Sequence, residues 1–180
     1  MNFVVIGTDH RMQNSECGFE ALLRAFLNQR YLLPLEAIAE EYHERLGRSM
    51  AQDLAEERGL RWFNLDMTPG EKFKAGILEN QFSRSISQEN VATRMSSDEL
   101  REEIWAKKLT NSCSGTTIVI CGYLHFESLV KKLRQKGHVV DKRVYLETVP
   151  EIRHGIMNCA AAVLNRSSAM SCEESPSTRG

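Results

Sequence analysis

The chain has 180 residues, a length typical of about one domain. Apolar residues make up 42% and charged residues 26%, close to the soluble globular average, which argues against wholesale disorder and against a membrane span. The 23 basic and 24 acidic residues give a net charge of −1, so the overall charge does not predict a nucleic-acid-binding protein.

The N-terminus and the cysteines favour a reducing compartment. The opening MNFVVIG has no basic segment and no cleavage site after a long apolar stretch, so it is unlike a secretory signal. The 5 cysteines contain no C-x-x-C pair, which argues against a zinc knuckle and a disulfide framework. We therefore expect a cytoplasmic protein that binds neither membranes nor nucleic acids.

The first forty residues predict a strand, a helix and one ambiguous segment. The β-branched run at 3–6, followed by Gly7, predicts a buried strand. Apolar residues at helical spacing predict a helix over 18–30. Segment 34–41 has a helix-favouring composition and an alternating pattern that also suits a strand, so the residues alone leave both open.

The middle of the chain predicts a capped helix, a strand and an irregular insert. Ser49 is expected to cap a helix that runs to residue 58, and the run at 60–66 predicts a strand. Pro69 stands where a helix can begin. The polar stretch 70–95 has no sustained period, and we expect it to form a mobile lid or insert.

The second half predicts a helix followed by a strand, a helix and a strand. A helix is expected over 97–109, with acidic residues in its first turn. The β-branched run at 116–121 predicts a buried strand, 125–136 predicts an amphipathic helix, and 138–146 predicts a further extended segment. A β-α-β unit of this kind requires a parallel sheet.

These elements predict an α/β fold with a mostly parallel central sheet and helices on both faces, in one compact domain over 1–164. From 165 to 180 the composition turns to Ser, Glu, Pro, Thr and Gly, which is typical of a disordered tail.

One four-residue pattern occurs twice, each time directly after a predicted buried strand. It reads GTDH at 7–10 and GYLH at 122–125, so that it ends in His10 and in His125. Functional groups gather beyond the carboxyl ends of parallel strands, where glycine permits a tight turn close to a ligand. The two imidazoles are therefore expected to converge on one crevice, where they suit metal binding or general base catalysis.

Structural roles compete with this hypothesis. His10 can instead cap a loop, and His125 can be a solvent-exposed residue at the start of a helix. A structural role is the preferred interpretation for His43, His138 and His154, because none of them follows a strand and a glycine turn.

A glutamate pair and an arginine complete the candidates. If 35–41 is a strand, Glu40 and Glu41 fall at its carboxyl end, where they can supply a hard oxygen ligand or a base for water. If it is a helix, they belong to a solvated face. Asp66 ends the next predicted strand in the same way. Arg101 suits a substrate carboxylate or a developing oxyanion, or is an ordinary surface arginine.

In four places the sequence resembles the TraB/TIKI superfamily, whose relatives include erythromycin-esterase-like and ChaN-type haem-binding proteins. VVIGTDH is similar to the first strand of the family with its G-x-x-H, and AIAEEY to the strand that bears the glutamate pair. REEIWAKKL resembles the Arg-containing helix, and VICGYLHFESLVKKLRQKGHVV resembles the second G-x-x-H unit. The four places follow the family's order and span residues 3–142.

The resemblance implies a strand at 35–41. The functional residues that it implies are His10, Glu40, Glu41, Arg101 and His125. Family members are metal-dependent peptidases or esterase-like hydrolases, and some of them bind haem or iron instead.

The leading hypothesis is a metal-dependent hydrolase of peptide or ester bonds. In it, His10 and His125, with Glu41 or Glu40, hold one divalent cation (Mn, Zn, Co or Fe), which lowers the pKa of its bound water to around 7. The other glutamate moves the proton, and Arg101 stabilises the developing negative charge.

Two other hypotheses stay open. In one, a binding protein holds haem, iron or a small ligand in the same crevice, with Tyr123 as an oxygen ligand to ferric iron. In the other, an interaction protein keeps the fold without the activity. The expected partner is a small-molecule or peptide substrate, and self-association into a homo-oligomer is left open.

Overall fold

The computed structural model describes residues 1–10, 12–15, 17–42, 47–77 and 96–146. Most of the predicted insert at 70–95 lies outside the described residues, and so do the predicted tail at 165–180 and the predicted domain end at 164. The described part of the chain has an α/β fold, as expected.

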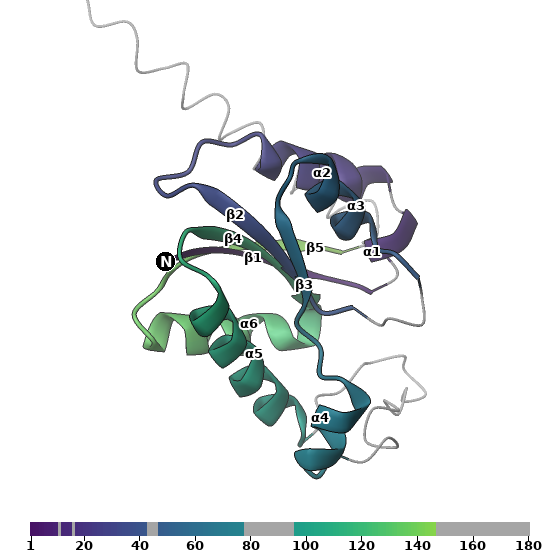
Figure 1. Cartoon of the computed structure of the whole chain (residues 1–180), viewed down its shortest axis with the longest axis vertical. Helices are drawn as coiled ribbons and strands as arrows, with labels where there is room; N and C mark the ends of the chain where they lie inside the picture. The colour runs from purple at the N-terminus through teal and green to yellow at the C-terminus, as the bar shows by residue number, and fades with distance from the viewer. Residues whose placement is uncertain (11, 16, 43–46, 78–95, 147–180) are drawn as a thin grey trace, which may run out of the picture. The chain divides into compact units, whose positions relative to one another are not determined.

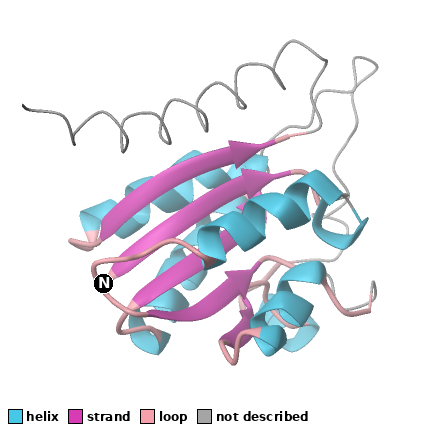
Figure 2. Ribbon diagram, turned by 90° about the horizontal axis from the view of Figure 1, so that it is seen from above, coloured by secondary structure: helices cyan, strands magenta, loops and turns pink. Residues whose placement is uncertain are grey.

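A five-stranded parallel sheet forms the centre of the fold, in the order β3-β2-β4-β1-β5. The strands are β1 (Asn2–Thr8), β2 (Leu35–Glu40), β3 (Arg61–Asn64), β4 (Thr116–Gly122) and β5 (Val139–Tyr145). Thr8 pairs with Gly122, and Glu40 pairs with Ile120, so the carboxyl ends of β1, β4 and β2 lie side by side (Figure 2). This shared edge brings the sequence candidates together.

Helices cover both faces of the sheet, with α1, α2 and α3 on one face and α5 and α6 on the other (Figure 1). The helices are α1 (Met12–Ser15), α2 (Cys17–Leu27), α3 (Met50–Glu57), α4 (Pro69–Lys74), α5 (Asp98–Ser112) and α6 (Tyr123–Gln135). In the described part of the chain, no helix combines the length and the apolar character needed to cross a membrane.

Side chains of β2 alternate between two hydrophobic cores, as they must in a strand. Ile38 packs in the core under α2 and α3, and Ala39 packs in the core under α5 and α6. The same alternation sends Glu40 toward α3 and Glu41 toward α5 and α6. The segment that composition alone left ambiguous is therefore a strand, β2, and its end separates the carboxylates of Glu40 and Glu41 onto opposite faces of the sheet.

Local sequence signals explain several element boundaries. The Ser49 side chain accepts a hydrogen bond from the Gln52 N–H at 3.1 Å and caps α3, as predicted. Thr68 and Glu71 form a reciprocal capping box at the start of α4, where Pro69 takes the first helical position. Pro69 marked this start in the sequence, but the helix itself occupies the first residues of the stretch 70–95, where no regular element was expected.

Two element boundaries near the G-x-x-H patterns differ from the expectations. Strand β1 continues through Gly7 instead of ending there, and α6 starts at Tyr123, so that His125 lies in its first turn. Strand β5 pairs with β1, not with β4, so the connection through α6 crosses over one strand. The sheet remains parallel, which is what the β-α-β pattern required.

Candidate functional site

The glycines of the two G-x-x-H patterns allow close approach at the ends of β1 and β4. A Cβ atom on Gly122 would lie 2.8 Å from His10 Nε2, and one on Gly7 would lie 2.7 Å from Phe126 Cγ. Neither glycine has a positive φ. The prediction that these glycines form tight turns is therefore wrong. They are needed because a side chain at either position would displace His10 or Phe126.

His10 follows β1 and is half exposed, with 49% of its side-chain surface accessible. Its Nδ1 lies 2.9 Å from Oε1 of the buried Gln13, and its Nε2 lies 3.7 Å from Glu41 Oε1. One ring nitrogen is thus tied to α1 and the other faces the carboxylate at the end of β2.

His125 is fully buried, so it is not a solvent-exposed residue of the helix start. Its Nδ1 lies 3.0 Å from Oε1 of the buried Glu102, and its Nε2 lies 3.5 Å from Glu41 Oε1. The Trp105 ring packs edge-on against the imidazole, with 4.9 Å between the ring centroids. The two imidazoles therefore converge on the same oxygen of Glu41, and His10 is the one that solvent reaches.

Glu41 is held at both carboxylate oxygens. Its Oε1 accepts a hydrogen bond from Arg101 Nη2 at 2.9 Å, and its Oε2 accepts one from the Gly122 N–H at 2.8 Å. Burial raises the pKa of Glu41, but attraction to His125, His10 and Arg101, together with the Gly122 N–H, outweighs burial and lowers it to about 2. Glu41 is therefore an ionised carboxylate in a buried setting.

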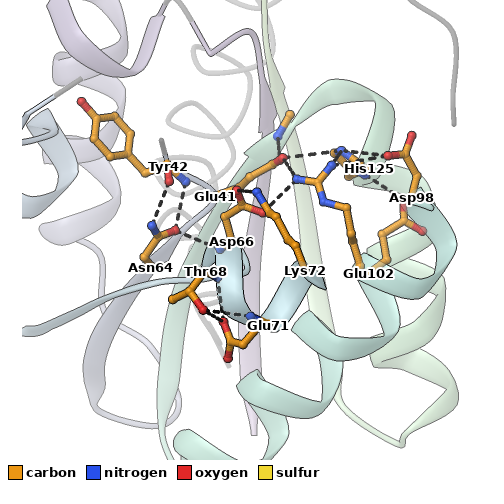
Figure 3. Close-up of polar contacts among 12 residues, drawn as sticks. Glu41, Tyr42, Asn64, Asp66, Thr68, Glu71, Lys72, Asp98, Glu102 and His125 are labelled. Atoms are coloured by element: carbon orange, nitrogen blue, oxygen red, sulfur yellow. Dashed lines mark hydrogen bonds and ion pairs between the residues drawn. The ribbon is translucent and has the colours of Figure 1, made fainter. Parts of the chain in front are cut away.

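Arg101 is the cation at the centre of this site and is only 7% exposed, so it is not a surface arginine. Besides Glu41, its guanidinium contacts Asp66 Oδ1 at 3.0 Å and Asp98 Oδ1 at 3.4 Å, and it lies over the Trp105 ring. We call this group the Glu41 cluster (Figure 3). Its members are Glu41, Asp66, Asp98, Arg101, Glu102 and His125.

Three residues of the site were not predicted from the sequence: Gln13, Asp98 and Glu102. Asp98, Arg101, Glu102 and Trp105 follow the spacing i, i+3, i+4, i+7, which places them on one face of α5. All four are buried. That periodicity was a usable signal, whereas Gln13, a neutral amide outside any motif, carried none.

Glu40 lies on the other face of the sheet, away from the Glu41 cluster. Its Oε2 accepts hydrogen bonds from Ser49 Oγ and from Trp62 Nε1, the latter at 3.1 Å. Its Oε1 is buried and has no hydrogen-bond partner among the described residues. Burial raises the pKa of Glu40 to about 7, against the opposing influence of Ser49, Trp62 and His10.

The remaining candidates lie outside the cluster. Tyr123, the predicted ligand for ferric iron, is the first residue of α6 and is 49% exposed. His138 Nε2 lies 3.1 Å from Thr110 Oγ1 and its ring meets Phe3 edge-on, which is a structural role as predicted. His43 and His154 fall outside the described residues.

The predicted metal ligands do not fit a divalent cation in the observed arrangement. Arg101 occupies the oxygen of Glu41 that both imidazoles approach, so a metal ion would have to displace a guanidinium. Within the described ranges, no three His, Cys, Asp or Glu side chains are arranged to hold a metal ion.

Comparisons with known proteins add no relative to this picture. A scan of protein-family models, a search of curated proteins and a search of solved structures each found no significant match. The motifs and the geometry of the strand ends are therefore the features that point to a function.

Proposed function

We propose that the chain is a hydrolase of ester or peptide bonds, with its reaction centre at the carboxyl ends of β1, β2 and β4. The observation that carries this proposal is a half-exposed imidazole, His10, whose Nε2 lies 3.7 Å from the buried, ionised Glu41. A histidine beside a fixed carboxylate suits general base catalysis near neutral pH. The resemblance to the TraB/TIKI superfamily implies hydrolysis of the same kinds of bond, although by metal-dependent enzymes.

In this mechanism His10 Nε2 takes a proton from a water molecule as the water oxygen attacks the substrate carbonyl. The imidazolium that forms is stabilised by the negative charge of Glu41. As the tetrahedral intermediate collapses, His10 returns the proton to the leaving alcohol or amine, and the acyl–oxygen or acyl–nitrogen bond breaks. General acid–base catalysis of this kind contributes roughly 10²–10⁴-fold to the rate.

Arg101 and His125 act through Glu41 in this proposal. Both are buried, and Arg101 donates to Glu41 and Asp66 at 2.9 and 3.0 Å, which leaves it poorly placed to meet a substrate oxyanion. We therefore give Arg101 a positioning role in place of the oxyanion role expected from the sequence. Gly122 holds the second oxygen of Glu41 through its N–H.

A metal-dependent reaction is the second candidate. It is favoured by one observation: His10 and His125 both direct Nε2 toward Glu41 Oε1 while Nδ1 faces an oxygen, as metal-ligating histidines commonly do. It would require Arg101 to release that oxygen.

The test is hydrolysis of a panel of nitrophenyl esters and fluorogenic peptides by the purified full chain, with a chelator and then with each divalent metal. We expect activity in the chelator that is lost in His10→Ala and kept in His138→Ala. The second variant is a matched control because His138 follows α6 at the opposite, amino end of β5.

Activity that appears only with added metal, together with one bound ion per chain, would favour the second candidate. Failure of the wild-type chain to hydrolyse any substrate in any condition would contradict the hydrolase proposal. It would then favour the haem-binding or interaction hypotheses, which a haem titration of the wild type and Tyr123→Phe separates.

A further inference from the structure

Gln13 connects the exposed imidazole to the backbone of β2. It lies in α1 and is only 1% exposed. Its Nε2 donates a hydrogen bond to the backbone carbonyl oxygen of Glu41 at 3.1 Å, and its Oε1 lies 2.9 Å from His10 Nδ1. One buried amide thus spans the end of β2 and the residue proposed as the base.

The carbonyl of Glu41 determines which way this amide faces. A backbone carbonyl only accepts hydrogen bonds, so the nitrogen of the Gln13 amide must be the atom that meets it. The amide oxygen then faces His10, and an amide oxygen also only accepts. The ring atom His10 Nδ1 must therefore carry a proton.

We propose that Gln13 is a positioning residue that fixes neutral His10 as the Nδ1–H tautomer. The lone pair of the ring is then on Nε2. Glu41 Oε1 lies 3.7 Å from Nε2, beyond hydrogen-bond distance, so the 2.9 Å contact with Gln13 and not the carboxylate selects the tautomer. This inference rests on the proposed function, since it explains how His10 presents its basic nitrogen to the reaction. Glu41 then acts on His10 twice, through its carbonyl by way of Gln13 and through its carboxylate.

The second G-x-x-H unit provides an internal comparison. His125 Nδ1 faces the Glu102 carboxylate at 3.0 Å, an acceptor when ionised, and Arg101 Nη1 lies 3.3 Å from His125 Nε2. Both contacts agree with a proton on Nδ1. Two imidazoles, which follow the ends of two different strands, thus carry the proton on the same ring nitrogen, and it is held there by an amide in one case and by a carboxylate in the other.

The exposure of His10 makes the role of Gln13 measurable. A neutral histidine side chain free in water favours the Nε2–H tautomer, and the hydrogen bond made by one ring nitrogen decides which nitrogen is protonated in a protein. Removing the acceptor should therefore let the half-exposed His10 return toward the Nε2–H form. His125, which is buried against Glu102, should not change.

The experiment is a long-range ¹H–¹⁵N correlation spectrum of the labelled full chain at about pH 9, where an ordinary histidine is neutral. The His10 signals are identified by their loss in His10→Ala. We expect Nδ1–H in the wild type, a shift toward Nε2–H in Gln13→Leu, and retention of Nδ1–H in Gln13→Glu, which keeps an acceptor. Gln135→Leu, at an exposed glutamine of α6, is the matched control.

An Nε2–H tautomer of His10 in the wild type would overturn the proposal, and so would an unchanged tautomer in folded Gln13→Leu. If Gln13→Leu fails to fold, the wild-type and Gln13→Glu spectra still decide. The spectra need no substrate, so their result is independent of whether hydrolysis is found. With a hydrolysed substrate, Gln13→Leu should lower kcat by up to roughly 10²-fold, the lower end of what general acid–base catalysis contributes, with little change in KM.

Discussion

The two carboxylates at the end of β2 are neighbours in the chain and opposites in environment. Glu41 faces Arg101, two histidines and a backbone N–H, and its pKa falls to about 2. Glu40 faces Ser49 and Trp62 across the sheet, and burial raises its pKa to about 7. Both side chains are buried, so the partners, not burial itself, decide which one is charged.

This difference assigns distinct chemistry to the two faces of one strand. A pair of titratable groups with pKa values pushed apart in this way is typical of sites that move protons. Glu41 keeps a permanent negative charge beside His10, whereas Glu40 holds a proton under mildly acidic conditions. On one face of the sheet the G-x-x-H units and α5 surround Glu41, and we call this the charged side. On the other face α3 and β3 surround Glu40, and we call this the neutral side.

The largest expected effect comes from removing the cation of the charged side. Arg101→Met leaves three carboxylates, those of Glu41, Asp66 and Asp98, without their shared partner. We expect a loss of about 3–5 kcal/mol in the free energy of unfolding, measured by urea denaturation, because a buried charge left unpaired is strongly destabilising.

Arg24→Met is the matched control for this substitution. Arg24 pairs with Glu20 and Glu57 at the surface, where ion pairs contribute little. Equal destabilisation by the two substitutions would show that the Glu41 cluster is no more important to stability than a surface network.

The second-largest expected effect is on the free energy of unfolding at low pH. The pKa of Glu41 is lower in the folded chain than in the unfolded chain, so folding is favoured above the unfolded value and loses stability as pH falls toward 2. The loss is about 3 kcal/mol over this window. In Glu41→Gln, urea denaturation at about pH 5 and about pH 3 should show a much smaller difference than in the wild type. An unchanged acid dependence would contradict an ionised Glu41.

The opposite slope is expected from Glu40. Its pKa is higher in the folded chain, so the wild type loses stability as pH rises from the ordinary glutamate value to about 7. Glu40→Gln removes this loss, and we expect the variant to be more stable than the wild type by about 2–3 kcal/mol at about pH 8 and equal to it at about pH 4. A variant less stable than the wild type at both pH values would contradict this account.

The smallest expected effect concerns space on the charged side. Gly122→Ala places a methyl group 2.8 Å from His10 Nε2 and 3.2 Å from Glu41 Oε2, and we expect a loss of about 1–2 kcal/mol from overpacking. Gly70→Ala in α4, where an added Cβ meets nothing within 4 Å, should cost nothing and serves as its control. Thermal unfolding of the two variants compares them, and equal melting temperatures would refute the crowding at Gly122.

The convergence of the two histidines could be predicted from the sequence because parallel strands share one edge for their carboxyl ends. Segment 35–41 could not be assigned from propensity, since its side chains alternate while its composition favours a helix, and the resemblance decided it correctly. The partners of Arg101 depend on how α5 packs against α6 and the sheet. Local sequence could not predict that packing. The packing buries Arg101, which by its sequence alone resembled a surface arginine.

The reason for the glycines could not be predicted either. Gly122 reads as a turn residue from its place after a strand, but what it meets is His10, 112 residues earlier in the chain. Such a requirement arises from tertiary contact and leaves no local pattern. Gln13 was missed for the same reason, because its partners are a ring nitrogen and a carbonyl oxygen that only the fold brings together.

The most direct test of the central claim is a pH titration of the side-chain carboxyl ¹³C signals of the two glutamates, assigned through Glu40→Gln and Glu41→Gln. The account predicts that Glu41 stays ionised to about pH 3 and that Glu40 titrates near pH 7, as their surroundings require. Titration midpoints near the ordinary glutamate value for both residues, or a higher midpoint for Glu41 than for Glu40, would contradict the account.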